Sequence, residues 1–413
     1  MVCEWTKAFL GEVAEELTVG RVGPMATEYV TTGIPFLRSQ NVEPLRLNDT
    51  DLKFISPEFH RRLRKSALSP GDVVIVRTGK PGACAVIPPS LPDANCSDLV
   101  IVRCGNGLDP RFLAYYVNTV ASSHVNAHLV GAVQQHFNVG SARKLEMLLP
   151  PLPEQRRIAS ILGALDDKIE LNRRMNRTLE EIAQAIFKSW FIDFGGQDDL
   201  VESELGLIPR GWEVGPLSRI ARLATNTVNP GGQPDRLWEH YSIPAYDQVG
   251  RPTLDLGASI KSNKYEVGKT AVLVSKLNPA IQRVWLPDVH DGDAAICSTE
   301  FMPFTPLEPR WRPFVYELLN SDAIQANICG RVTGTTGSRQ RVRPGDIANM
   351  MIALPPRDLI EGISGVIEPL HNRRLLNLRE SATLAVLRDT LLPKLISGEI
   401  RVPEAEEILE EAL

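Results

Sequence analysis

The chain has 413 residues, of which 45 are Lys or Arg and 50 are Asp or Glu, so its formal net charge is −5. Hydrophobic residues make up 43% and charged residues 23%, values typical of a soluble globular protein, which exclude a disordered or fibrous chain. The length exceeds that of one ordinary domain and predicts two or three.

No apolar run approaches the roughly 18 residues that span a membrane, and acidic residues stand where a secretory signal would be apolar. We therefore expect a cytosolic protein without a membrane partner. The six cysteines are scattered without a C-x-x-C pair, so we expect them to be reduced and mostly buried. The clustered histidines His124, His128 and His136 lack a further ligand at usable spacing, and we predict no metal site.

The first segment, residues 1–150, is predicted to be a globular domain of strands and short helices. Short β-branched runs bounded by turn residues predict strands within 72–77 and 97–103. A basic cluster, whose side chains suit phosphate groups, precedes them, and an amide and an imidazole lie near the end of the segment. These candidates are Arg61, Arg62, Arg64, Lys65, Gln135 and His136. Taken singly, such a cluster is more often a solvated surface.

Residues 151–194 predict a long central helix. Ile158, Leu165, Asn172, Leu179 and Ile186 recur every seven residues, and Leu162, Ile169, Asn176, Ala183 and Trp190 form a companion row. Two such rows are typical of a coiled-coil seam. A helix of about 40 residues would be on the order of 60 Å long.

The polar segment 195–205 is interpreted as a linker, and residues 206–353 as a second globular domain with a strand at 270–275. Basic and amide side chains, which can contact phosphates and base edges, occur in two groups. They are Lys276, Asn278 and Arg283 in one group, and Arg339, Gln340, Arg341 and Arg343 in the other.

Residues 354–400 predict a second long helix, followed by an acidic tail at 401–413 without an assigned role. Its seam contains Ile363, Leu370, Asn377, Leu384 and Leu391, while Pro369 and Pro393 are predicted to kink or end the helix. Asn172 and Asn377 occupy the same heptad position in the two helices. They either form a buried polar pair that fixes the register or lie at the edge of the seam.

The chain also contains an internal repeat. Leu149-Pro150-Pro151 matches Leu354-Pro355-Pro356 at an offset of 205 positions, and the match continues without a gap to Leu179 and Leu384. Gln135 and Gln340 obey the same offset. Because a repeat of this length indicates two copies of one unit, we predict two domains of one mixed α/β fold, related by a pseudo-twofold axis.

Sequence motifs for catalysis are missing from the chain. There is no glycine-rich cofactor loop after a strand, no G-x-S-x-G and no H-E-x-x-H. Gly268-Lys269-Thr270 suggests a phosphate loop, but position 263 is Asn rather than Gly and the tripeptide precedes a strand-like run. We therefore expect a protein without catalytic residues.

Three segments carry a resemblance to a known family. Residues 149–194 resemble the central helical region of the specificity subunits of type I restriction-modification systems. Residues 383–402 resemble their C-terminal helical region, and GLIPRGWEV at 206–214 resembles the entry into their second target-recognition domain.

The resemblance implies an architecture and a set of partners. Two target-recognition domains would each recognise one half of a bipartite, asymmetric site in double-stranded DNA, and two long antiparallel helices would serve as the spacer. Two methyltransferase subunits would dock on the chain and bring S-adenosylmethionine, and restriction-translocase subunits would join. The chain itself would hold no cofactor and would be non-catalytic.

Two other interpretations remain open on the residues alone. A doubled domain with coiled-coil helices would also fit a scaffold that binds proteins and has no nucleic-acid role. A nucleotide-using transferase at Gly268-Lys269-Thr270 is the other alternative. Salt-dependent DNA binding would distinguish the first from a DNA-specificity subunit.

Overall fold

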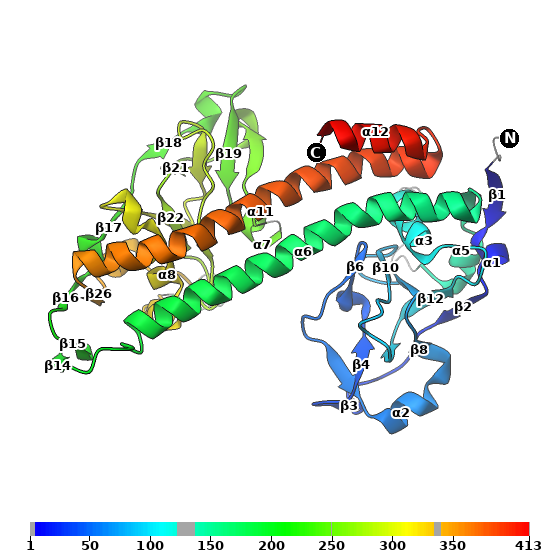
Figure 1. The fold of residues 1–413 in the computed structure, drawn as a ribbon, viewed down its shortest axis with the longest axis horizontal. Coiled ribbons are helices and arrows are strands. Elements are labelled where there is room, and N and C mark those ends of the chain that lie inside the picture. Colours follow the sequence, from blue (N-terminus) through cyan, green and yellow to red (C-terminus); the bar gives the residue numbers. More distant parts are fainter. Residues whose placement is uncertain (1–4, 122–136, 249, 334–339, 413) are drawn as a thin grey trace. The chain divides into compact units, whose positions relative to one another are not determined.

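The computed structural model describes residues 5–121, 137–248, 250–333 and 340–412. The chain forms two compact units, Met1–Glu170 with Ala382–Leu413, and Leu171–Ser381. Each unit combines two main β-sheets with helices, which confirms a mixed α/β fold (Figure 1). None of the described helices is long and apolar enough to cross a membrane.

The first unit contains a four-stranded antiparallel sheet and a five-stranded mixed sheet. In order across the first sheet, the strands are β10 (Cys84–Val86), β9 (Val73–Val76), β12 (Leu99–Arg103) and β2 (Glu16–Val19). Across the second they are β3 (Tyr29–Val30), β7 (Lys53–Ile55), β4 (Ile34–Leu37), β11 (Ala94–Cys96) and β8 (Ala67–Leu68), with β4 and β11 parallel. The predicted strands at 72–77 and 97–103 are thereby confirmed as β9 and β12.

Shorter elements complete the first unit. A two-stranded sheet joins β1 (Thr6–Phe9) to β13 (Glu146–Leu149), and β5 (Val42–Glu43) pairs with β6 (Arg46–Leu47). The short helices are α1 (Leu10–Val13), α2 (Pro57–Arg62), α3 (Pro110–Tyr116) and α5 (Val139–Arg143).

The second unit repeats this plan. Its four-stranded sheet has the order β23 (Val284–Trp285), β22 (Val272–Ser275), β25 (Phe301–Pro306) and β17 (Ala221–Leu223). Its five-stranded sheet has the order β18 (Thr227–Val228), β21 (Lys264–Glu266), β24 (Ala295–Cys297), β19 (Leu237–Tyr241) and β20 (Thr253–Leu256). β16 (Glu213–Pro216) pairs with β26 (Met351–Leu354) as β1 pairs with β13.

Strand order therefore confirms that the two halves share one fold. Taken by their order along the chain, the strands of the two four-stranded sheets occupy equivalent places, and the parallel pair β4–β11 corresponds to β19–β24. One difference lies in the first short strand of each five-stranded sheet. β3 pairs with β7, whereas β18 pairs with β21, so these strands lie at opposite edges of otherwise equivalent sheets.

Helices of the second unit flank its sheets. They are α7 (Ile243–Gln248), α8 (Arg312–Asn320), α9 (Asp322–Gly330) and α10 (Pro344–Ala348). Gly268, Lys269 and Thr270 form the turn between β21 and β22, so the tripeptide leads into a strand and not into a helix, unlike a phosphate loop.

Two long helices, α6 (Leu152–Phe191) and α11 (Arg357–Ser397), contribute residues to both units. They pack antiparallel through the predicted seam. In the first unit Leu165 and Ile169 pack against Leu384. In the second unit Ala183 and Phe187 belong to one core with Ile360, Ile363 and Ile367.

Four features of these helical segments correct the predictions. α11 continues through Pro369 and Pro393, because packing of its buried face outweighs the local cost of each proline. Trp190 is 46% exposed, and Phe187 and Phe191 are buried instead. The predicted linker contains β14 (Leu200–Ser203), which forms a hairpin with β15 (Gly206–Pro209).

The fourth correction concerns the acidic tail, which is the helix α12 (Val402–Ala412). Val402 and Ala405 are buried in the core of the first unit, and Leu409 packs against it. Apolar residues at this spacing line one face of a helix, so the acidic residues occupy the other face. Arg157 forms an ion pair with Glu406 at 3.2 Å.

Four of the five described cysteines are buried, and all five are free thiols. Cys84, Cys96, Cys104 and Cys297 are the buried ones, whereas Cys329 is exposed. Burial raises the pKa of the Cys84 and Cys297 thiols, which keeps them protonated and unreactive.

Candidate nucleic-acid interface

In the first unit, a basic loop lies where strand β9 ends and strand β12 begins. Val76 pairs with Leu99, so the residues beyond them, Arg77 and Asp98, are neighbours. Arg77 Nη1 donates to Asp98 Oδ1 at 2.7 Å, and Thr78 Oγ1 donates to Asp98 Oδ2 at 2.8 Å. Both carboxylate oxygens of Asp98 are therefore occupied by the residues that follow β9.

A hollow of about 520 Å³ opens beside this loop. Most of the residues that line it have polar side chains, and they include Arg38, Gln40, Thr78, Lys80, Ser97 and Asp98. Arg38 donates to Asp51, and hydrogen bonds from Lys53 and Arg38 lower the pKa of Asp51 to about 2. Asp51 is therefore ionised at neutral pH and orients the guanidinium of Arg38.

In the second unit, the structure brings together two groups of candidates that are far apart in the sequence. Val342 N donates to Lys276 O at 3.1 Å, and Asn278 N donates to Gln340 O at 2.9 Å. Leu277 and Arg341 face each other in an antiparallel bridge. Lys276, Asn278, Gln340 and Arg341 thus belong to one short β-ribbon at the end of β22.

This ribbon is the equivalent of the loop in the first unit. Phe137 N donates to Arg77 O at 3.1 Å, as Val342 N does to Lys276 O. Phe137 and Val342 are related by the same offset of 205 as the rest of the repeat. Both units therefore place a basic residue, Arg77 or Lys276, directly after the equivalent strand and tie it to a returning segment.

Arg341 is held by a carboxylate. Its Nε donates to Glu300 Oε2 and its Nη2 donates to Glu300 Oε1, each at 3.0 Å. This fork geometry is the strongest form of an arginine–carboxylate contact. The hydrogen bonds that Arg341 donates to Glu300 also raise the pKa of Arg341, so the guanidinium is charged at any physiological pH.

Arg283 differs from the other candidates. Its side chain is 7% exposed, and its Nε and Nη2 donate to the two oxygens of Asp247 at 2.7 Å each. It directly precedes β23, whose two residues are buried, and its own side chain is buried with them. Because Arg283 is buried and bound to Asp247, we no longer consider it a candidate for DNA contact.

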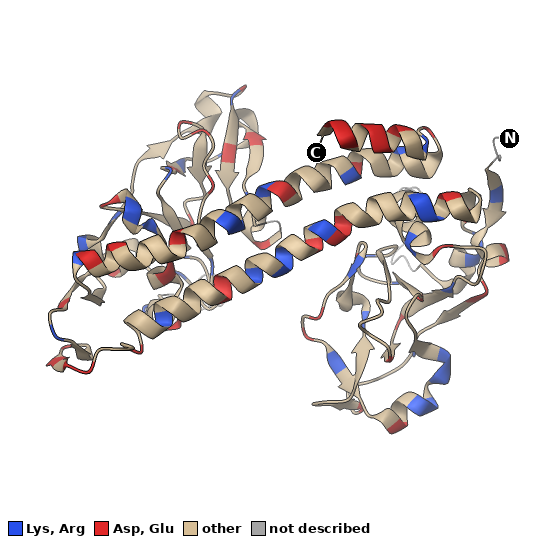
Figure 2. Cartoon of the chain, in the orientation of Figure 1, with Lys and Arg blue, Asp and Glu red and all other residues tan. Residues whose placement is uncertain are grey.

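The basic cluster of the first unit lies on α2 and the turn that follows it (Figure 2). Its four basic residues are exposed. Ser56 caps α2 by accepting from Phe59 N, and Pro57 begins the helix. Arg62 stacks over the Phe59 ring at 5.0 Å. Within the described parts of the chain, no ion pair engages Arg61, Arg64 or Lys65.

Three candidates, Gln135, His136 and Arg339, lie outside the described residues. Arg343 is exposed and occupies the position before the first residue of α10, without a capping hydrogen bond from its side chain. Among the residues that the structure does describe, no group of three or more His, Cys, Asp or Glu side chains is placed to hold a metal ion.

Sequence reasoning missed Arg77, Thr78, Lys80 and the two carboxylates Asp98 and Glu300. A signal for the first was present. The apolar runs before Arg77 and Lys276 belong to equivalent strands, and a basic residue follows each. The carboxylates carried no such signal, because their pairing with an arginine depends on which loops the sheet brings together.

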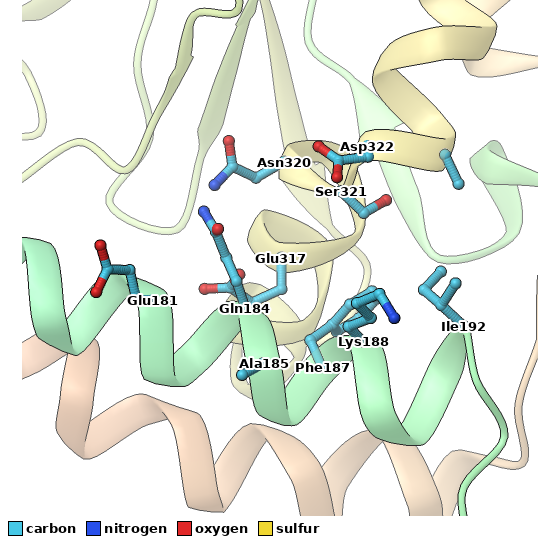
Figure 3. A pocket seen from close by; sticks show the side chains of 11 residues that line it. Glu181, Gln184, Ala185, Phe187, Lys188, Ile192, Glu317, Asn320, Ser321 and Asp322 are labelled. Atoms are coloured by element: carbon cyan, nitrogen blue, oxygen red, sulfur yellow. The ribbon is translucent and has the colours of Figure 1, made fainter. Parts of the chain in front are cut away.

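A second hollow, of about 290 Å³, lies between α6 and α8 in the second unit (Figure 3). Side chains of α6, among them Glu181, Gln184 and Lys188, face Glu317 and Asn320 of α8. Lys188 forms an ion pair with Asp193 at 2.6 Å, and Glu317 lies 2.6 Å from His371. The other charged residues that line this hollow, Glu181 and Asp322, are acidic, so the hollow does not suit an anionic partner such as DNA.

The two seam asparagines are buried, Asn172 at 0% and Asn377 at 1% exposure. Asn172 Nδ2 donates to Glu380 Oε2 at 2.8 Å and lies 3.4 Å from the backbone oxygen of Asn377. Asn377 Nδ2 donates to Asn176 Oδ1 at 2.8 Å. The burial excludes the seam-edge interpretation, and each amide is bonded to the opposite helix.

Comparisons with known proteins find similar chains in one family. Residues 3–181 match the family described as the type I restriction modification DNA specificity domain. The MjaIX specificity subunit of a type I restriction enzyme from Methanocaldococcus jannaschii is 27% identical over 72% of this chain and 71% of its own length. The HindI specificity subunit from Haemophilus influenzae is 23% identical over 63% of this chain and 70% of its own length.

A solved structure shares the fold. The S subunit of a type I restriction-modification system from M. genitalium superposes with a TM-score of 0.58 at 12% identity. The alignment covers 95% of this chain and 96% of that one.

Proposed function

Because the chain belongs to the specificity subunits of type I restriction-modification systems, we propose that it selects a bipartite DNA site, one half-site for each globular unit. The observation that carries this proposal is the duplicated loop at the ends of β9 and β22. Both copies place basic or amide side chains beside a returning segment at the same sheet edge. Two equivalent loops, one in each unit, suit a DNA site that consists of two half-sites.

We assign two kinds of contact to the exposed candidates. Arg61, Arg62, Arg64 and Lys65 bind phosphates, which orients the unit on the duplex without reading its sequence. Lys276, Asn278, Gln340, Arg341 and Arg343 read the second half-site, since amide and guanidinium groups match base edges in the major groove. Gln135 and His136 are proposed for the first half-site on their positions in the repeat, and Arg339 for the second.

The reaction itself belongs to the partners in this proposal. Methyltransferase subunits bring S-adenosylmethionine and methylate adenines within the selected site, and restriction-translocase subunits join the same complex. Two methyltransferase subunits would match the two globular units. The chain contributes no catalytic residue and decides only which DNA the complex acts on.

The experiment is a competition assay with the full chain in complex with its methyltransferase. Methylated positions mapped in cells first define the two half-sites, and competitor duplexes then carry changes in one half at a time. Arg341→Ala should weaken discrimination in one half-site only, by about 1 to 3 kcal/mol for a lost bidentate contact. Arg210→Ala is the control, because Arg210 is an exposed arginine of the β14–β15 hairpin that pairs with Asp199.

Other outcomes would change the assignment. An equal loss for every duplex would make Arg341 a phosphate contact, and no loss would return it to an ordinary surface residue. If the unaltered complex bound DNA without sequence preference or salt dependence, the scaffold interpretation would replace the DNA-specificity function.

A further inference from the structure

We infer that Asp98 and Glu300 are positioning residues for DNA readout, each holding one arginine in the orientation in which it meets the bases of its half-site. The inference rests on the proposed function and adds to it the residues that set specificity within each unit. It is drawn from the matching places of the two carboxylates and from their contacts.

The two carboxylates occupy one structural position. Asp98 directly precedes Leu99, which pairs with Val76 of β9, and Glu300 directly precedes Phe301, which pairs with Ser275 of β22. Each acid therefore stands at the start of the long strand that lies next to the loop-bearing strand. Asp98 has a φ of 54°, a left-handed conformation that is uncommon outside glycine.

The arginines that they hold come from different segments. In the first unit the residue after the strand is Arg77, and Asp98 binds it. In the second unit the residue after the strand is Lys276, and Glu300 binds Arg341 from the returning segment. The acid thus occupies the same position in both units, while the arginine comes from a different segment in each. A fixed acid of this kind can orient base-reading arginines that come from different positions in the sequence.

The surroundings of the Asp98 contact are those of a binding site. Asp98 lines the hollow of about 520 Å³ together with Thr78, Gln40 and Lys80. The Nε atoms of Arg77 and Arg38 and the Oδ1 atom of Asn278 are buried with no hydrogen-bond partner among the described residues. Unpaired buried polar atoms are uncommon in folded proteins, and some of those in this chain lie at the equivalent loops of both units.

A carboxylate beside an arginine favours specificity over affinity. Its negative charge repels the DNA backbone, which weakens binding to every sequence alike. In return it fixes a long, flexible side chain before DNA arrives, so that fewer conformations are lost on binding. The two effects predict opposite responses when the charge is removed, and this makes the inference testable.

The test replaces each acid by its amide in the full chain with its methyltransferase partner. Asp98→Asn should reduce discrimination at one half-site about tenfold, and Glu300→Gln should do so at the other half-site only. Binding to unrelated DNA should stay equal or become tighter in both variants. Discrimination is measured by competition with duplexes changed in one half-site at a time, and binding to unrelated DNA is measured over a range of salt.

Matched controls remove a carboxylate charge near the opposite ends of β12 and β25. Glu16 on β2 pairs with Arg103, the last residue of β12, and Glu308, two residues beyond β25, pairs with Arg357; the controls are Glu16→Gln and Glu308→Gln. Neither should change discrimination. Arg77→Ala should give the same half-site loss as Asp98→Asn, and the double variant should be no worse than either single variant.

Tighter binding to all duplexes with unchanged discrimination would overturn the inference and make the acids simple repulsive charges. Loss of discrimination at both half-sites in one variant would also overturn it, because the effect would then be general. Absence of sequence preference in the unaltered complex would refute the proposed function itself. A thermal unfolding midpoint equal to that of the parent chain establishes that the variants are folded.

Discussion

At the residue scale, the basic side chains differ in whether an acidic side chain of the same chain already binds them. Arg283 is buried against Asp247, and Arg341 is bonded to Glu300. Arg61, Arg64 and Lys65 are exposed on α2 and its following turn. Only the last group has no such partner among the described residues, which suits phosphate binding.

Arg62 gives a direct test of the phosphate-contact assignment. Arg62→Ala should weaken binding to all DNA sequences alike and reduce the slope of log affinity against log salt by about one, because one phosphate contact is lost. Affinity is measured over a series of salt concentrations. Lys7→Ala, which removes an exposed lysine paired with Glu146, is the control and should leave the slope unchanged. A sequence-selective loss in the Arg62 variant would contradict the assignment.

His240 predicts a dependence of stability on pH. Burial lowers its pKa, and the nearby Asp255, whose Oδ2 lies 2.8 Å from Nδ1, raises it less. Because the folded-state pKa is lower than the unfolded one near 6.5, the folded state binds fewer protons. The stabilisation is present above pH 6.5 and is lost as the pH falls through the folded-state pKa.

The thermal unfolding midpoint of the second unit should therefore fall between pH 7.5 and pH 5.5, and His240→Gln should reduce this fall. His290→Gln is the control, since His290 is an exposed histidine of the same unit. An unchanged pH dependence in the His240 variant would show that other groups cause the acid sensitivity.

At the element scale, the two long helices are joined by apolar layers and by one buried polar layer around Asn172 and Asn377. Asn377 Nδ2 donates to the side chain of Asn176. Asn172 Nδ2 donates to the side chains of Glu380 and Ser381, and of Asn377 it approaches the backbone oxygen alone. A Leu at position 377 would remove the first contact and leave the second. The register therefore depends on three asparagines and not on a single pair.

This arrangement predicts the outcome of two double-mutant cycles. Asn377→Leu should cost about 1 to 3 kcal/mol in the free energy of unfolding, because it leaves Asn176 without its donor. The cycle of Asn377→Leu with Asn176→Leu should show strong coupling, and that with Asn172→Leu should be closer to additive. Denaturant unfolding measures both. Stronger coupling for Asn172 with Asn377 would mean that these two amides contact each other directly.

At the scale of the whole molecule, two copies of one fold are built on two shared helices. The repeat places equivalent strands, loops and carboxylates in each unit, yet the loop side chains differ. Different side chains on a common frame suit recognition of an asymmetric sequence. Catalytic motifs do not appear in the sequence of either copy.

The purified chain alone should therefore show neither methyl transfer nor DNA cleavage. Methylation should appear only when a methyltransferase subunit is added, and it should follow the DNA preference of this chain. Transfer of labelled methyl groups to DNA, measured with each component alone and with both together, is the test. Turnover by the isolated chain, free of contaminating enzyme, would contradict the prediction.

The sequence by itself determined the features that depend on local pattern. β-branched runs predicted β9, β12 and β22, the seven-residue spacing predicted α6 and α11, and the ungapped repeat predicted a doubled fold. These signals are legible because a strand or helix buries one face and so repeats its apolar residues at a fixed period.

Only the tertiary structure decided the contacts between distant segments. It joined residues 276–278 to 340–342, placed Arg77 on Asp98, buried Arg283 on Asp247 and packed α12 into the first unit. It also carried α11 through Pro369. Each outcome depends on a partner far away in the chain, and a side chain's charge or propensity does not specify which partner the fold will bring to it.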